Sequence, residues 1–225
     1  MMQAGLTALD QLLHSRYSCR GFLPDPVPED VLRQIVVAAG RAPSWCNAQP
    51  WKVTLTRGAE TQRFRTALLE TVSAEPPAPD LPWPEQYTGV HQDRRRACGH
   101  QLYEAAGIAR DDHAARKDQT MRNFSFFDAP HVAIISSGRE LGPYGAMDCG
   151  GFVTAFTLAA TVLGVASIAQ ASVAAYPQLI RRHFDLSEDR LILCAISLGY
   201  ADADHPANTF RTARADLGDI YDPRG

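Results

Sequence analysis

Apolar residues in the first third of the chain repeat mainly at helical spacing. Leucines at intervals of three and four predict a helix over 6–14. A second helix is expected over 28–40, where Pro28 and two acidic residues precede a run of apolar positions. Residues 51–56, WKVTLT, alternate between apolar and polar positions and predict a strand, and helical spacing returns over 59–72.

A proline-rich segment separates these elements from the rest of the chain. Residues 73–84, SAEPPAPDLPWP, hold five of the 15 prolines, a density that excludes a regular helix or a central strand. We interpret the segment as a linker that is ordered by Trp83. Two further helices, predicted over 86–106 and 110–126, are rich in arginine, histidine and aromatic residues and form an insertion between core elements.

The last third of the chain alternates short apolar runs with helical segments. Buried strands are predicted over 131–137, 164–169 and 191–200, and the last of these, LILCAISLGY, is the most apolar. A helix rich in small residues is predicted over 147–163, and its composition suits close packing in a core or a dimer interface. A shorter helix is predicted over 176–184.

These elements predict an α+β or α/β domain with a small, largely buried sheet, because helices dominate and long helical connections separate the four strands. The length of 225 residues fits one domain or two small ones. Residues 201–225 are polar but contain Phe210, Leu217, Ile220 and Tyr221. A tail of this composition is either disordered or lies across another surface.

The composition is that of an ordinary globular protein and excludes some partners. The chain has 45% hydrophobic residues, with 22 Lys+Arg against 25 Asp+Glu, which gives a formal net charge of −3. Binding of nucleic acid is therefore not expected, because it requires a clustered excess of Lys and Arg. The one basic cluster, residues 94–96, is interpreted as a solvated helix face.

No membrane segment, secretion signal or metal site is expected. No uninterrupted apolar stretch reaches the roughly 18–20 residues of a membrane span, and the N-terminus lacks the pattern of a signal peptide. We therefore expect a cytoplasmic protein. The five cysteines are scattered without CxxC or Cys/His spacing, so they are interpreted as reduced thiols that serve mostly in packing.

Residues 16–20, RYSCR, are the first candidate binding motif. In an extended chain Arg16, Ser18 and Arg20 project to the same side. Two guanidinium groups flanking a hydroxyl could hold a phosphate or a polyol through charge-assisted hydrogen bonds. The alternative is a solvated surface stretch.

Residues 43–51, PSWCNAQPW, are the second candidate. They combine amide side chains, which can bind the donor and acceptor edge of a ring, with two tryptophans between prolines. A capped turn with Ser44 as the N-cap explains the same pattern equally well.

Two later segments could also contact a ligand. Residues 164–172, GVASIAQAS, run from a predicted strand into a turn of small residues, where bare backbone could approach a flat ligand. Residues 208–214, NTFRTAR, add two arginines near the C-terminus, unless they are simply an exposed tail. Neither GxGxxG nor a P-loop is present, and no GxSxG or HExxH motif points to a hydrolase. His131 opens an apolar strand and is expected to be structural, and Cys46 has no neighbour in the sequence that would activate it.

Taken in order, five segments resemble the nitroreductase family of FMN-dependent oxidoreductases, with a pattern closest to nitroaromatic and nitrobenzoate reductases. The likeness spans nearly the whole chain, including the proline-rich insertion. The matching segments are SRYSCRGF (15–22), APSWCNAQPW (42–51), RNFSFFDAPHVAII (122–135), DCGGFVTAFTLAATVLGVASIAQAS (148–172) and LGYADADHPANTFRTAR (198–214).

The resemblance implies a single three-layer α+β domain over 1–225, with a small mixed sheet surrounded by helices. It also implies a helical lid at about 75–125. A C-terminal arm at about 201–225 would be exchanged in a homodimer that has two flavins at its interface.

The family pattern, carried over position by position, implies a set of FMN-binding residues and no catalytic side chain. The set is Arg16, Tyr17, Ser18, Arg20, Pro43, Ser44, Asn47, Asn123, Gln170, Ala171, Ser172, Arg211 and Arg214.

Within this set, Arg16, Ser18 and Arg20 would hold the phosphate, the ribityl chain and the pyrimidine edge of FMN. Arg214, with Arg211, would complete the phosphate site, and Asn123 would contact the ring. Pro43, Ser44 and Asn47 would come from the second subunit.

Gln170, Ala171 and Ser172 match the loop beside the flavin N5. Some relatives carry an acidic residue where this chain has Ala171, which is harmless if the contact is made through the main chain.

The resemblance further implies that hydride passes from NADPH or NADH to flavin N5 and then to a flat, electron-poor acceptor such as a nitroaromatic or a quinone. Donor and acceptor would use the same ring face in turn, which predicts ping-pong kinetics. Two other readings stay open. One is a flavoenzyme of the same fold with another reaction, reductive dehalogenation or flavin breakdown, and the other is a flavin-binding module without catalysis.

Overall fold

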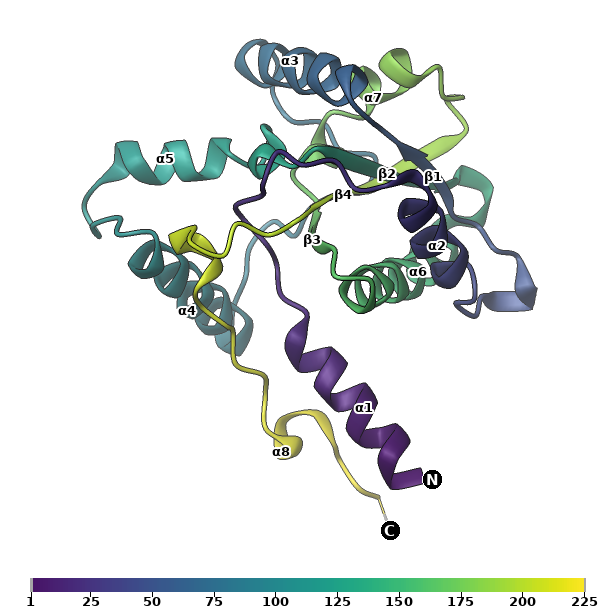
Figure 1. Cartoon of the computed structure of the whole chain (residues 1–225), viewed down its shortest axis with the longest axis vertical. Helices are drawn as coiled ribbons and strands as arrows, with labels where there is room; N and C mark the ends of the chain where they lie inside the picture. Colours follow the sequence, from purple (N-terminus) through teal and green to yellow (C-terminus); the bar gives the residue numbers. More distant parts are fainter. Residues whose placement is uncertain (1, 225) are drawn as a thin grey trace.

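Four antiparallel strands form one sheet at the centre of the molecule (Figure 1). The computed structural model describes residues 2–224. In spatial order the strands are β1 (Lys52–Leu55), β2 (His131–Gly138), β4 (Arg190–Gly199) and β3 (Ala166–Gln170). All four lie where the apolar runs predicted them, within about two residues.

The predicted mixed sheet needs a correction, because every strand ladder is antiparallel. Parallel pairing enters as a single bridge between Ser18 and Ser167. The apolar patterns determine which residues form strands, but they do not determine whether neighbouring strands are parallel or antiparallel. A long helical connection allows the next strand to run in either direction.

Both faces of the sheet are covered by hydrophobic clusters, and the residues of β2 show this. Val132 and Ile134 pack into one hydrophobic cluster, whereas Ala133 and Ile135 pack into the other. Because successive side chains of a strand point to opposite faces, an uninterrupted apolar strand requires a helical layer on each side. This confirms the predicted three layers.

Two pairs of helices supply these layers. On one face lie α3 (Ala59–Ala74) and α7 (Pro177–Phe184), which contribute Phe64 and Ile180 to the core. On the other face lie α2 (Glu29–Ala39) and α6 (Gly142–Val162), which contribute residues that include Leu32, Phe152 and Phe156.

The helix α6 is the most apolar helix of the molecule. Residues 139–162, which include it, are long and apolar enough to cross a membrane by length and composition alone. In the fold, α6 packs against α2, β2 and β3, so the core accounts for one side of this composition. Its other side leaves Tyr144, Met147 and Val162 exposed.

The insertion consists of α4 (Gly89–Ala105) and α5 (His113–Met121), which lie to one side of the sheet (Figure 1). The helix predicted over 110–126 is therefore too long. The chain turns over residues 126–128, where all three φ angles are positive, so that Phe126 and Phe127 enter the core. Burial of two aromatic rings outweighs continuation of a solvated helix.

The two ends of the chain lie at the same end of the molecule (Figure 1). Helix α1 (Met2–Ser15) exposes Leu6, Leu9 and Leu13. The C-terminal arm carries the short helix α8 (Leu217–Ile220). Asp219 of this helix pairs with Arg94 of α4 at 3.0 Å, which places the arm beside the insertion.

Candidate functional site

A cavity of about 690 Å³ opens where the end of α1, the 16–20 segment, α4 and the C-terminal arm meet. It is lined by Asp10, Leu13, His14, Arg16, Tyr17, Ser18, Arg20, Cys98, Phe210, Arg211, Thr212, Ala213 and Arg214. Six of the thirteen predicted cofactor residues therefore line one cavity, although up to 198 positions separate them in the chain.

The 16–20 segment is extended because it runs beside β3. Ser18 bridges to Ser167, and the Cys19 N–H donates to the Ser167 carbonyl at 3.1 Å. The Cys19 side chain is fully buried in the core, whereas Ser18 and Arg20 line the cavity. Alternation thus separates Cys19 from Ser18 and Arg20, although Tyr17 lines the cavity as well.

Two aromatic rings stack against the arginines of the cavity. The Arg20 guanidinium carbon lies 5.6 Å from the Phe210 ring centre, and that of Arg211 lies 3.8 Å from the Tyr17 ring centre. Each pair joins the 16–20 segment to the C-terminal arm through a cation–π contact. The arm therefore completes the cavity.

The described residues include one carboxylate in the cavity lining, Asp10, and it forms no ion pair with the four arginines. Burial, and second the nearby Arg214 charge, lower the pKa of Arg16, and burial lowers the pKa of Arg20. Among residues 2–224, no carboxylate lies within ion-pair distance of Arg16, Arg20, Arg211 or Arg214. A bound anion would relieve the repulsion between Arg16 and Arg214.

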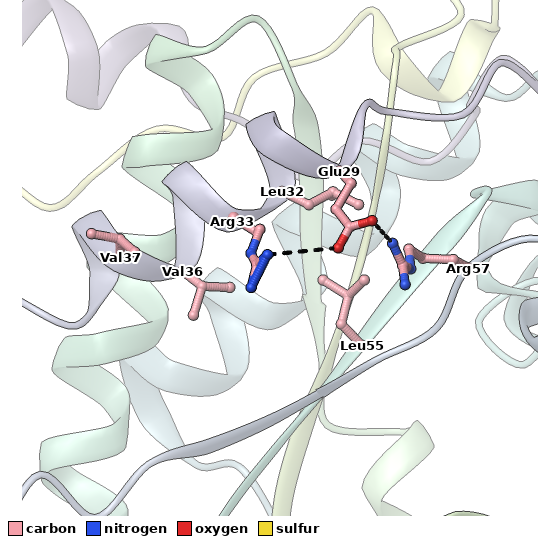
Figure 2. A pocket seen from close by; sticks show the side chains of 7 residues that line it. All are labelled: Glu29, Leu32, Arg33, Val36, Val37, Leu55 and Arg57. Carbon is pink, nitrogen blue, oxygen red and sulfur yellow. Dashed lines mark ion pairs between the residues drawn. The ribbon is translucent and has the colours of Figure 1, made fainter.

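A second hollow, of about 310 Å³ between α2 and β1, differs in this respect (Figure 2). Its floor is formed by apolar residues such as Leu32 and Leu55. Its two arginines, Arg33 and Arg57, both face Glu29, with Arg33 at 3.9 Å and Arg57 in closer contact. Because Glu29 offsets part of this charge, the hollow attracts an anion less strongly than the first cavity does.

Asn208, which sequence reasoning did not select as a site residue, holds the arm in place. Its Oδ1 accepts the Arg20 N–H at 2.7 Å, and its Nδ2 donates to the carbonyls of Gly21 and Asp202 at 2.9 Å each. The side chain is buried. In the sequence, Asn208 was visible only as a polar residue that precedes two arginines. That position did not indicate that its side-chain amide would form hydrogen bonds with backbone groups.

The loop after β3 lies outside this cavity, and its residues differ in exposure. Gln170 is 3% exposed; its Nε2 donates to the Asn123 carbonyl at 2.8 Å, and its Oε1 accepts from the Ser197 hydroxyl. The Gln170 and Asn123 side chains thus hold each other in the fold. Ala171 is exposed and Ser172 is half-buried, so this loop presents mainly backbone and small side chains.

The structure does not bring Pro43, Ser44 and Asn47 to the cavity of their own chain. They belong to an exposed turn around the 3₁₀ helix η1 (Trp45–Asn47). The Ser44 hydroxyl accepts a hydrogen bond from the Gln49 N–H at 2.9 Å. The predicted N-cap residue therefore closes a turn of six residues, 44–49. These three residues remain available to a ligand of another copy.

Comparison with known proteins gives consistent matches over most of the chain. The model of the nitroreductase family matches residues 13–200. The nitroreductase NfnB of Mycolicibacterium smegmatis is 36% identical over 213 residues, covering 94% of this chain and 91% of that protein. The nitrobenzene nitroreductase of Ectopseudomonas oleovorans is 31% identical, with 93% of each chain covered.

A solved structure is also very similar. It is the FMN-dependent nitroreductase NfnB from Mycobacterium smegmatis in complex with NADPH, with a TM-score of 0.93 and 35% identity. The match covers 98% of this chain and 99% of that one.

Proposed function

The chain belongs to the nitroreductase family, and we propose that it is an FMN-dependent oxidoreductase that uses NADPH or NADH to reduce a nitroaromatic or quinone acceptor. The observation that carries the proposal is the cavity with four arginines that lack carboxylate partners. The phosphate of FMN carries about two negative charges near neutral pH, opposite in sign to this surplus.

In the proposed complex, Arg16 and Arg214 bind the phosphate, because their mutual repulsion is relieved by an anion between them. Ser18, on the same side of the extended segment, binds the ribityl chain. Arg20 lies deeper and binds the pyrimidine edge of the ring, where its charge favours the reduced, anionic flavin. Tyr17 and Arg211 hold each other and wall the site.

The loop after β3 would lie beside the isoalloxazine ring. Ala171 carries no bulky side chain, so the ring can approach the backbone of residues 170–172. The buried Gln170 and its partner Asn123 hold that backbone in place rather than reaching the flavin themselves. When bound, FMN supplies the redox chemistry, accepting hydride from the nicotinamide and reducing the acceptor.

No side chain is required as a nucleophile in this scheme. The protein would bind and orient the flavin, and donor and acceptor would use the site in turn. We therefore propose ping-pong kinetics, with the α4–α5 lid over the acceptor.

We also propose that residues 1–225 act as one domain with a lid at about 75–125, and that the protein works in the cytoplasm.

The spectrum of the purified protein, loaded with FMN under anaerobic conditions, tests the function. We expect the flavin absorption to bleach on addition of NADPH or NADH and to return when a nitroaromatic is added. Permanent loss of colour in air would favour a flavin-destroying enzyme of the same fold. Stable colour that no nicotinamide bleaches would favour a binding module, and failure to take up FMN would overturn the proposal.

We further propose that the active form is a homodimer in which Pro43, Ser44 and Asn47 of one copy complete the flavin site of the other. Exposed apolar side chains occur on α1, on α6 and on the arm, surfaces that a second copy would cover, and also on the linker and the start of α4. They include Leu6, Leu9, Leu13, Met147, Val162, Leu217, Ile220 and Tyr221.

Light scattering of the flavin-loaded protein is expected to give twice the chain mass of 24.6 kDa. In a dimer, Asn47→Ala should weaken FMN binding even though Asn47 lies outside the cavity of its own chain. A monomer that still binds FMN tightly would contradict this arrangement.

A further inference from the structure

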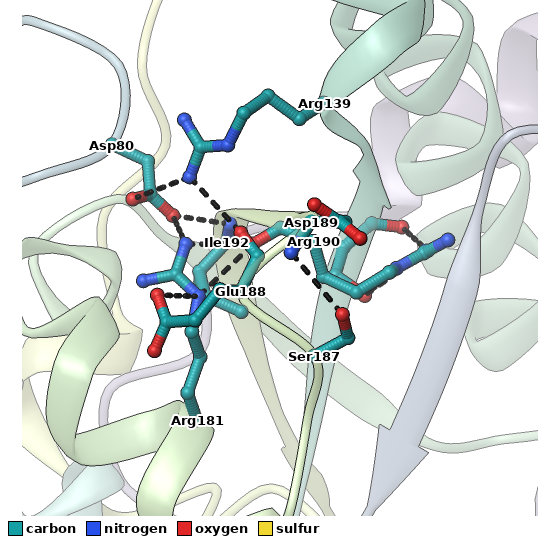
Figure 3. A network of polar contacts seen from close by, with 9 residues as sticks. Asp80, Arg139, Arg181, Ser187, Glu188, Asp189, Arg190 and Ile192 are labelled. Carbon is teal, nitrogen blue, oxygen red and sulfur yellow. Dashed lines mark hydrogen bonds and ion pairs between the residues drawn. The ribbon is translucent and has the colours of Figure 1, made fainter.

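An acidic residue of the proline-rich linker is largely shielded from solvent at the end of the sheet. Only 9% of the Asp80 side chain is exposed, although the flanking linker lies on the surface. Its Oδ2 accepts from Arg181 Nη2 at 2.5 Å and from the Ile192 N–H at 2.8 Å (Figure 3). Arg139 Nη2 lies 3.7 Å from the other carboxylate oxygen.

The linker occupies the place beside β4 that β3 leaves free. Pairing of β3 with β4 reaches Ala195, whereas β4 begins at Arg190. Asp80 accepts the N–H of Ile192 beyond that last pair, and the Ala78 N–H donates to the Ala175 carbonyl at 2.8 Å. Backbone groups at this end of the sheet are thus satisfied by the linker.

Arg181 makes the attachment strong, because its charge is buried. Its side chain is 2% exposed, and Nε and Nη2 donate to the Arg190 carbonyl at 3.2 and 2.7 Å. Glu188 lies 3.7 Å from Nε but is 72% exposed. Asp80 is therefore the buried partner of this guanidinium, and a buried charge without its partner is costly.

The segment that follows Asp80 is stiff, so the position of Asp80 restrains the residues after it. Prolines stand on both sides of it, at 79 and 82 and again at 84, and each fixes its own φ angle. Five residues after the last of these prolines, α4 begins at Gly89. The start of α4 is therefore restrained by the point at which the linker is attached.

Helix α4 depends on such restraints because none of its described residues is buried. Its other contacts include the 3₁₀ helix η5 (Pro206–Asn208), the exposed Arg94–Asp219 pair and the stacking of Arg116 of α5 on Tyr103. Yet α4 contributes Cys98 to the cavity that contains Arg16 and Arg20. A helix without its own buried face takes its position from its attached ends.

From these contacts we propose that Asp80 is a positioning residue, whose pair with Arg181 fixes the linker and thereby the α4 wall of the cofactor cavity. The kinetic consequence, weaker binding of the acceptor when the pair is broken, rests on the proposed function. The structural consequence, movement of α4, does not.

The structural consequence can be measured by the alkylation rate of Cys98 with a maleimide, followed peptide by peptide in the purified protein with and without added FMN. In Asp80→Ala we expect Cys98 to react about fivefold faster or more, because local opening of α4 becomes easier. The rate of a free thiol, glutathione, under the same conditions serves as the reference. Asp80→Asn keeps the shape but loses the charge, and should give a smaller increase.

Glu188→Gln is the matched control, since Glu188 approaches the same guanidinium but lies outside the linker. It should leave the Cys98 rate unchanged. If Asp80→Ala does not fold, Asp80→Asn carries the test alone. Cys98 rates in the Asp80 variants that equal the rate in Glu188→Gln would overturn the proposal.

Steady-state kinetics supply the second measurement. We expect the KM for a nitroaromatic acceptor to rise about threefold or more in Asp80→Ala, with kcat and FMN affinity within about twofold of wild type. A purely structural defect would lower kcat and flavin content together, and that result would contradict a positioning role. If the wild-type protein binds no FMN, the proposed function fails, whereas the Cys98 rates still decide whether Asp80 positions α4.

Discussion

Replacing Arg16 with alanine is expected to raise the Kd for FMN by about 10- to 100-fold. A hydrogen bond to a charged group contributes roughly 1.5–3 kcal/mol, and each 1.4 kcal/mol is a factor of ten in affinity. Arg16 and Arg214 line the same cavity and their charges interact, so we expect the phosphate to contact both guanidinium groups. The measurement is fluorescence titration of the apoprotein with FMN at low and at high salt.

The same substitution should not destabilise the apoprotein. Arg16 has no carboxylate partner among residues 2–224, and the neighbouring Arg214 charge helps to lower its pKa, so its removal relieves repulsion. Thermal unfolding without FMN should therefore occur at or above the wild-type temperature. Weaker FMN binding together with unchanged or higher stability of the apoprotein distinguishes a ligand-binding arginine from a structural one.

Arg57→Ala is the matched control, because that guanidinium lies in the other hollow and is paired with Glu29. Its Kd for FMN should stay within about twofold of wild type. An unchanged FMN affinity in Arg16→Ala, or equal losses in the two variants, would remove Arg16 from the phosphate site.

Replacing His131 with phenylalanine is expected to lower the free energy of unfolding by about 2–5 kcal/mol, since two buried backbone groups would lose their partner. His131 is 2% exposed. Its Nε2 accepts the Val27 N–H at 3.0 Å, and its Nδ1 donates to the Thr56 carbonyl at 3.1 Å. The ring thus ties the segment before α2 to the end of β1. Urea unfolding at neutral pH gives the difference.

His131 should also make stability depend on pH. Burial lowers the pKa of His131, and a proton on Nε2 would face the Val27 N–H. The unfolded chain therefore binds a proton more readily than the folded one below about pH 6.5, the ordinary histidine value. The stabilisation is complete above that pH and is lost as the pH falls.

Urea unfolding of wild type and variant at pH 7.5 and pH 5.5 tests the sign. The wild type should lose more stability on acidification than His131→Phe. Burial also lowers the pKa of His205, so a smaller dependence should remain in the variant. His91→Gln, on the exposed surface of α4, is the control, and equal pH dependence in wild type and His131→Phe would refute the assignment.

The sequence by itself determined the elements and their inward faces. Apolar periodicity is local, since a strand alternates every second residue and a helix repeats at about 3.6 residues, so β2, β4 and α2 could be located without knowledge of their neighbours. The same alternation predicted that Arg16, Ser18 and Arg20 share one side. The helix over 110–126 was overextended, because the turn that buries Phe126 and Phe127 depends on a core that local spacing does not describe.

The tertiary structure alone decided which of these residues meet. Packing of distant segments sets the strand direction. It also brings Asn208 to Arg20 across 188 positions and Asp80 to Arg181 across 101 positions. It also turned the Gln170 side chain into the fold and kept Pro43, Ser44 and Asn47 away from the cavity of their own chain. A polar side chain carries no periodic signal for its partner, because its hydrogen bonds are set by whichever backbone group or charge the fold brings within about 3 Å.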